Sequence, residues 1–141
     1  SADPDLVDHA GAVLFSNTFA RLAMANPKLA PYGRSAKVVL TKLGLINKLQ
    51  NKIIYAENIS TTYQYVASGN VALGFIALSQ IYKDGGISHG SVWVIPKSLI
   101  PLIKQDGVLT KFGEKNLVAQ KFINFMHSAT ARLIIKNAGY M

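Results

Sequence analysis

The stretch that decides the fold is RLAMANPKLAPYGRSAKVVLTKL, which spans residues 21–43. Residues 21–25 are apolar, and the run is short enough for a buried strand. The Asn-Pro pair at 26–27 and the Pro-Tyr-Gly triplet at 31–33 predict that no regular structure forms between them. The first half of the stretch is therefore expected to be a strand followed by an irregular loop.

A helix is expected to follow this loop, beginning at Arg34 and ending at Gly44. Its apolar residues have the i, i+3, i+4, i+7 spacing of one helix face, and they are Ala36, Val39, Leu40 and Leu43. A strand–loop–helix unit of this kind directs backbone N–H groups and the positive end of the helix dipole at one point. The unit therefore predicts a site for a small anion.

Outward from this unit, strands and helices alternate along the chain. Apolar, β-branched or aromatic runs predict further strands at residues 52–56, 71–76 and 91–95. Helical patterns predict helices at residues 45–50, 59–68 and 79–82. This alternation predicts an α/β fold with a mostly parallel sheet flanked by helices. The run at 71–76 is apolar on both faces, as strands of buried parallel sheets are.

Caps and breakers predict further features in the first 96 residues. Asp3 followed by proline predicts the start of a short helix at residues 3–10, which Gly11 ends. The Asp-Gly-Gly sequence at 84–86 predicts a break in regular structure after the helix expected at 79–82.

From Pro96 the pattern changes to an extended connection, with a Lys-Gln-Asp-Gly turn at 104–107. An amphipathic helix is predicted at 116–127 and a last helix at 128–137, which Gly139 ends. The first of these helices carries an apolar stripe that includes Phe122, Phe125 and Met126. The stripe is expected to be buried core rather than a cofactor site.

Composition limits the class of protein. The 141 residues are 50% hydrophobic, enough for one domain or two small lobes with a core, and no apolar run reaches the roughly 20 residues of a membrane helix. The chain has no cysteine, which excludes disulfides, and the spacing of its three histidines predicts no metal site. It opens on Ser-Ala-Asp without a signal peptide, as expected for the interior of a longer chain.

The charge balance suits an anionic partner but does not identify one. The chain has 15 Lys and Arg against 7 Asp and Glu, a net charge of +8. The basic residues are dispersed, which favours a solvated surface over a nucleic-acid interface. A basic nucleic-acid-binding module is therefore a remote alternative, and no nucleic acid is expected as a partner.

Catalytic patterns are poorly represented. The sequence has no H-E-x-x-H, EF-hand or Walker motif. Glu57 is the only acid between His9 and Tyr82, so this part of the chain has no pair of carboxylates for acid–base chemistry. His89 lies in a Gly- and Ser-rich segment that is more typical of a surface loop than of a catalytic base. A binding protein is therefore expected rather than an enzyme.

Two of the predicted helices begin directly after predicted strands, and in a parallel sheet such turns lie at the same edge. Two helix N-termini that meet there bind an oxyanion without a charged side chain. The candidate ligand-binding residues are Tyr32, Gly33, Ile59 and Ser60. The main-chain N–H groups of Tyr32 and Ile59 are the expected donors. The side chains expected to act as helix caps are those of Asn58, Ser60 and Ser35. The alternative is that these turns, which every α/β domain has, bind nothing.

Several segments, in order and with their spacing, resemble the periplasmic molybdate-binding proteins of ABC importers. They include ANPKLAPYGRSAKVVLTKLGL at 25–45 and AENISTTYQYVASGNVALGFIALSQI at 56–81, and the likeness covers residues 21–141. It implies a type II periplasmic-binding-protein fold of two lobes that closes on molybdate or tungstate. It also implies a periplasmic protein that presents the oxyanion to a membrane permease, without a cofactor and without catalysis. Where some members have a tyrosine ligand, this chain has Ala77.

The resemblance also implies how the chain divides into lobes. Residues 21–97 correspond to the second lobe, and residues 1–20 and 98–141 to an incomplete first lobe that lacks the family's serine turns. The donors of one cleft wall are then absent, so weak molybdate binding is expected, together with self-association through exposed apolar surface. The alternatives of the same fold are the effector-sensing domain of a transcription regulator and a receptor for another oxyanion such as sulfate or phosphate.

Overall fold

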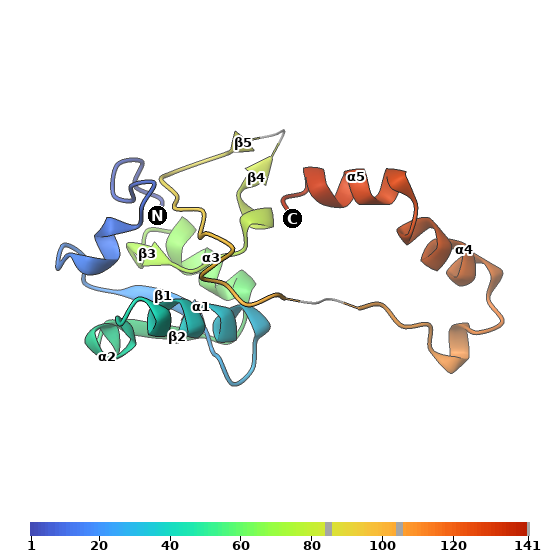
Figure 1. The fold of residues 1–141 in the computed structure, drawn as a ribbon, viewed down its shortest axis with the longest axis horizontal. Helices are drawn as coiled ribbons and strands as arrows, with labels where there is room; N and C mark the ends of the chain where they lie inside the picture. Colours follow the sequence, from blue (N-terminus) through green and yellow to red (C-terminus); the bar gives the residue numbers. More distant parts are fainter. Residues whose placement is uncertain (84–85, 104–105, 141) are drawn as a thin grey trace.

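A computed structural model of the chain describes residues 1–83, 86–103 and 106–140 (Figure 1). At its centre is a parallel sheet in the order β2-β1-β3, formed by β1 (Leu22–Ala25), β2 (Ile53–Ala56) and β3 (Leu73–Gly74). The helices that connect these strands are α1 (Pro31–Lys42), α2 (Ile46–Leu49) and α3 (Ile59–Ala67). The predicted α/β fold, a mostly parallel sheet flanked by helices, is confirmed.

The central strand, β1, is buried on both faces. Leu22 and Met24 are at most 1% exposed and belong to the same apolar cluster as Leu40 of α1. Ala23, between them, faces the other side of the sheet and packs with Val66 of α3. α1 and α3 therefore cover opposite faces of the sheet, and each begins just beyond the carboxyl end of a strand.

α1 begins at Pro31 rather than at Arg34, so its predicted start is wrong. Proline is favoured at the first helical position, because its fixed φ is already helical and an N–H group there would have no helical partner. The triplet at 31–33 is therefore the first turn of the helix and not part of an irregular loop. The predicted end is confirmed, since Gly44 follows α1 with a φ of 70°, which glycine adopts without strain.

α3 begins where the sequence predicts, after a cap at Asn58. The side-chain oxygen of Asn58 accepts a hydrogen bond from the N–H of Thr61 at 2.9 Å. The hydroxyl of Thr62, a fully buried residue, donates to the carbonyl oxygen of Asn58 at 2.8 Å. The first turn of α3 is thus fixed both by its cap and by a buried hydrogen bond.

Two predicted strands differ from the structure. In place of a strand at 71–76, β3 covers only Leu73–Gly74, and the chain then turns into the 3-10 helix η2 (Leu78–Gln80). In place of a strand at 91–95, the chain joins no sheet, and the N–H of Ser91 donates to the carbonyl of Ser1 at 3.2 Å. An apolar run alone does not make a strand, because a strand also needs a neighbour with the matching hydrogen-bonding groups.

The predicted helix at residues 3–10 is wrong. The Oδ1 atom of Asp3 accepts a hydrogen bond from the N–H of Asp5 at 2.9 Å, and the carbonyl of Asp3 accepts one from the hydroxyl of Ser91. The N–H of Val7 donates to Ser91 Oγ at 2.9 Å. These side-chain bonds replace the helical backbone bonds that the capping pattern predicts. Gly11 is a turn residue with a φ of 71°, and the 3-10 helix η1 (Ala12–Phe15) follows it.

The chain after β3 forms a small hairpin that the sequence does not predict. η2 stands in place of the predicted helix at 79–82, and β4 (Tyr82–Lys83) pairs antiparallel with β5 (Gly86–Ile87). Gly86 therefore belongs to a strand rather than to the predicted break. The other two residues of that break, 84–85, lie outside the described residues.

The C-terminal part consists of η3 (Lys111–Gly113), α4 (Leu117–Met126) and α5 (Ala129–Asn137). Both predicted helices are confirmed, and the side chains of Asn116 and Ser128 cap them. α4 contacts α5 and stands away from the sheet, beyond an extended connection (Figure 1). Half of the predicted turn at 104–107 lies outside the described residues. Within the described ranges, no helix has the length and apolar character needed to cross a membrane.

The predicted burial of the apolar stripe on α4 is wrong. Phe122 is 59% exposed, Phe125 44% and Met126 38%. The helix has the apolar period that the sequence predicts, but it stands away from the sheet and its stripe stays in contact with solvent (Figure 1). Periodicity predicts an apolar face and does not say what covers it.

Candidate functional site

The carboxyl ends of β1 and β2 form one edge of the sheet. Ala25 pairs with Ala56, and the N–H of Asn26 extends this pairing by donating to the carbonyl of Ala56 at 2.8 Å. Beyond this edge the chain enters α1 on one face of the sheet and α3 on the other. Adjacent parallel strands whose connections leave toward opposite faces form the crevice in which α/β proteins bind ligands.

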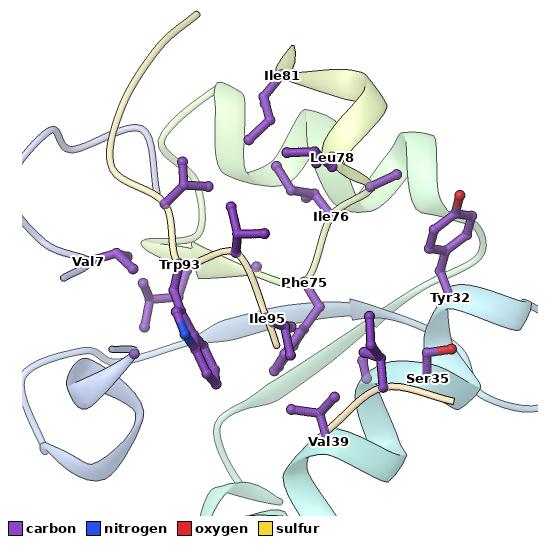
Figure 2. A pocket seen from close by; sticks show the side chains of 18 of the residues that line it. Val7, Tyr32, Ser35, Val39, Phe75, Ile76, Leu78, Ile81, Trp93 and Ile95 are labelled. Atoms are coloured by element: carbon purple, nitrogen blue, oxygen red, sulfur yellow. The ribbon is translucent and has the colours of Figure 1, made fainter. Parts of the chain in front are cut away.

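A cavity of about 650 Å³ reaches this crevice at Tyr32 and Ile59 and extends past the end of β3 to the N-terminal segment (Figure 2). Its wall includes Tyr32 from α1, Ile59 from α3, the chain that follows β3, and residues 91–97. The two residues predicted to supply main-chain donors therefore line one cavity. The other two predicted site residues are not part of its wall, since Gly33 is buried against β1 and Ser60 is exposed.

The N-terminus of α1 lies at this cavity, with Tyr32 in its wall. Its first intrahelical bond runs from the N–H of Arg34 to the carbonyl of Ala30, at 3.1 Å. Pro31 has no N–H, so the N–H groups ahead of that bond belong to Tyr32 and Gly33. They lie at the positive end of the helix dipole. Arg34 itself is exposed and is not part of the cavity wall.

Gly33 allows α1 to approach the end of β1 closely. A Cβ atom at this position would overlap the carbonyl oxygen of Ala25, and it would lie 2.7 Å from the carbonyl carbon of Ala25 and 2.8 Å from that of Asn26. Only glycine fits this contact with the backbone. Gly33 therefore acts on the candidate site by fixing where the first turn of α1 lies.

The N-terminus of α3 is tied to the chain that follows β3. The Nε2 atom of Gln80 donates to the carbonyl of Ile59 at 3.2 Å, and its Oε1 atom accepts from the N–H of Ala77 at 2.9 Å. Asn58 caps this helix as predicted, whereas Ser60, the other residue expected to cap it, is an exposed residue of the first turn. Gln80 thus holds Ile59 against one wall of the cavity.

Residues that the sequence does not predict as ligand-binding complete the wall. The predicted cap at Ser35 is wrong, because α1 begins earlier and makes Ser35 its fifth residue, buried and facing the cavity. Phe75, Trp93 and Ile95 contribute large apolar side chains (Figure 2). Trp93 also packs on Gly11, where a Cβ atom would lie 2.6 Å from the indole Cδ2.

The described wall of the cavity carries little charge. Among the described residues that line it, Lys97 has the only charged side chain, and none is acidic. The amino group of Ser1 also lies in the wall and donates to the carbonyl of Ser91 at 3.1 Å. Burial lowers the pKa of this amino group, and the nearby Asp3 carboxylate partly opposes that shift. Among the described lining residues, no side chain would therefore repel an anion.

Residues 86–90 read Gly-Ile-Ser-His-Gly, which has the letters of the G-x-S-x-G nucleophile elbow. That motif works only on a sharp strand-to-helix turn. Here Ser88 follows the hairpin strand β5, the described residues directly after it form no helix, and its hydroxyl donates to the carbonyl of Ile81 at 3.0 Å. The local structure therefore does not make Ser88 a nucleophile.

The comparison with known families agrees with this geometry. Residues 4–141 match the family described as bacterial extracellular solute-binding protein. The chain belongs to this family. Its fold is that of the periplasmic binding proteins, and it superposes on the solved structure of the Azotobacter vinelandii periplasmic molybdate-binding protein with a TM-score of 0.93 and 40% identity. That match covers 100% of this chain and 62% of the other.

Two curated relatives are similar over the whole chain. The molybdate-binding protein ModA of Azotobacter vinelandii is 45% identical over 140 residues, which are 99% of this chain and 56% of the relative. ModA of Rhodobacter capsulatus is 40% identical over 141 residues, 100% of this chain and 54% of the relative. The chain thus spans about half the length of the curated relatives it matches.

Proposed function

We propose that the chain is part of a solute-binding component of an ABC importer and that it binds molybdate or tungstate. The observation that carries this proposal is that the N-termini of two helices, at Tyr32 and Ile59, line one cavity without an acidic residue among its described lining. The names of the relatives, which are molybdate-binding proteins, support the choice of oxyanion. The protein would act in the periplasm, deliver its oxyanion to the membrane permease and catalyse no reaction.

The binding would rest on neutral groups. Main-chain N–H donors at Tyr32 and Ile59, which line the cavity, would contact one side of the oxyanion, and no cofactor would take part. The N–H groups of Gly33 and Ser60 follow in the same two helical turns. Residues 21–97 would supply this wall of the cleft, as the second lobe. Residues 1–20 and 98–141 would belong to the first lobe, whose remaining part would supply the opposite wall. We therefore expect the 141 residues alone to bind molybdate far more weakly than a complete relative.

Thermal unfolding with added oxyanions tests the proposal. A ligand that binds only the folded chain stabilises it by RT ln(1 + [L]/Kd), about 1.4 kcal/mol at ten times the Kd. For a chain of this size we expect molybdate and tungstate to raise Tm by about 3–5 °C at that concentration. Sulfate at the same ionic strength is the matched control, and equal shifts with sulfate and molybdate would point to a receptor for another oxyanion. No shift with any oxyanion would contradict the proposal.

The cap of α3 offers a sharper test, because Asn58→Asp keeps the capping oxygen and adds a negative charge beside the site. We expect this variant to be as stable as the wild type. A like charge within several ångströms should weaken molybdate binding by about tenfold or more. Asn58→Ala is the control, since it loses about 1 kcal/mol of stability with the cap but adds no charge. If titration gives the same molybdate Kd for Asn58→Asp and Asn58→Ala, the anion binds away from α3.

We also propose a role for the α4 apolar stripe, which consists of Val118, Phe122, Phe125 and Met126. The solved Azotobacter structure matches this chain over its whole length and leaves 38% of its own chain outside the match (100% − 62%). A stripe as exposed as this one is rare on a soluble monomer. We propose that the remaining part of a complete protein covers the stripe, and that the 141 residues alone self-associate through it.

A further inference from the structure

The described part of the chain has three buried polar side chains, those of Ser35, Thr62 and Ser91. Thr62 donates its hydroxyl to the carbonyl of Asn58, and Ser91 donates its hydroxyl to the carbonyl of Asp3. The hydroxyl of Ser35 has no hydrogen-bond partner among the described residues, although Ser35 is only 6% exposed. The Ser35 hydroxyl therefore keeps its hydrogen-bonding capacity for a partner from outside the protein.

The position of Ser35 in α1 connects it with the candidate site. Ser35 follows Tyr32 by three residues, so the two lie on the same face of the helix, about 5–6 Å apart at their Cβ atoms. Side chains of a helix tilt toward its N-terminus, which brings the Ser35 hydroxyl toward the first turn. Ser35 and Tyr32 both line the cavity, with Ser35 just below Tyr32 in Figure 2.

The hydroxyl is also accessible from the cavity. Among the described residues, every side-chain polar atom that is fully sealed from solvent has a hydrogen-bond partner. Because the Ser35 hydroxyl has none, it is not sealed, and Ser35 is part of the cavity wall. A ligand in the cavity can therefore reach this oxygen.

We propose that Ser35 is a ligand-binding residue, whose hydroxyl donates a hydrogen bond to the oxyanion at the N-terminus of α1. This inference rests on the proposed function and adds a side-chain donor to the main-chain donors of Tyr32 and Gly33. A hydroxyl suits this place, because it donates to an anion without bringing a charge into a mostly apolar cavity. In the free chain the partner of this hydroxyl is solvent, which the oxyanion would replace.

The variant Ser35→Ala tests the proposal, because it should weaken ligand binding and leave stability almost unchanged. Without ligand, we expect the melting temperature of Ser35→Ala to be close to that of the wild type, since the Ser35 hydroxyl has no hydrogen-bond partner in the protein to lose. With molybdate, we expect its Kd to be about tenfold higher or more, since a hydrogen bond to a charged group is lost. Thr41→Ala is the matched control, because Thr41 is an exposed hydroxyl residue of the same helix that donates to the carbonyl of Lys37 at 2.8 Å.

The outcomes separate this inference from the proposed function. If molybdate binds Ser35→Ala as tightly as the wild type, Ser35 is not a ligand-binding residue and the proposed function stands. The inference is equally overturned if Ser35→Ala unfolds at a lower temperature and its molybdate Kd is unchanged, since the hydroxyl then serves only the fold. If neither molybdate, tungstate nor sulfate binds the wild type, the proposed function fails, and the inference fails with it.

Discussion

Replacing Gly33 by alanine is expected to lower the free energy of unfolding by about 3 kcal/mol, because the new methyl group would overlap the backbone at the end of β1. The carbonyl groups of Ala25 and Asn26 belong to the sheet edge and cannot move away as a flexible side chain could. The first turn of α1 must shift instead, and its N–H donors shift with it. We therefore expect Gly33→Ala to lose oxyanion binding as well as stability, as measured by denaturant unfolding and by titration with molybdate.

Two other glycines serve as controls for Gly33→Ala. A Cβ atom at Gly107 would meet nothing within 4 Å, and we expect Gly107→Ala to change stability by less than about 0.5 kcal/mol. Gly44 also has free space but has a φ of 70°, so Gly44→Ala should cost about 1 kcal/mol through backbone strain alone. If Gly33→Ala proves no more destabilising than Gly44→Ala, the close contact between α1 and β1 is not as the structure places it.

The sequence predicts those parts of the fold whose signals are local. β1 and β2 are apolar runs bounded by turn residues, and both have the predicted positions. Helices α3, α4 and α5 are confirmed because each has a capping side chain directly before its apolar period. The start of α1 is missed since Pro31 reads equally well as a turn residue and as the first residue of a helix.

Features that depend on distant partners are beyond the sequence pattern. Asp3 has the signature of a helix cap, but Ser91 binds this segment from the far side of the chain, and the predicted helix does not form. The run at 91–95 has the composition of a strand, yet it makes hydrogen bonds to Ser1 in place of the regular backbone hydrogen bonds between paired strands. Neither outcome can be derived from a window of neighbouring residues.

The same distinction applies to the candidate site. Tyr32 and Ile59 can be predicted as neighbours, because parallel strands bring their following turns to one edge of the sheet. Ser35 was expected to be a cap and not part of the site while α1 was expected to begin at Arg34, since a serine near a helix start is typical of a cap. Once α1 begins at Pro31, the three-residue spacing from Tyr32 places Ser35 on the cavity side of the helix.

Replacing Phe122 and Phe125 by aspartate is expected to weaken self-association of the chain by at least about 100-fold. Each phenylalanine buried in an interface contributes about 1.5–3 kcal/mol, so the loss of two is worth about 3–6 kcal/mol. Both side chains are exposed in the single chain, 59% and 44%, so its free energy of unfolding should change little. Sedimentation over a range of concentrations measures the association, and denaturant unfolding checks the fold.

The control for this double variant is Asn124→Asp, which adds one negative charge to α4 at an exposed position away from the stripe. It should associate like the wild type, because charge alone does not remove apolar contact area. A second experiment adds the part of the Azotobacter relative that lies outside the match, produced separately. This part should compete with the self-association of the wild-type chain, and it should not bind the double variant. A wild-type chain that stays monomeric, with no affinity for that part, would mean that the α4 apolar stripe is not a docking surface.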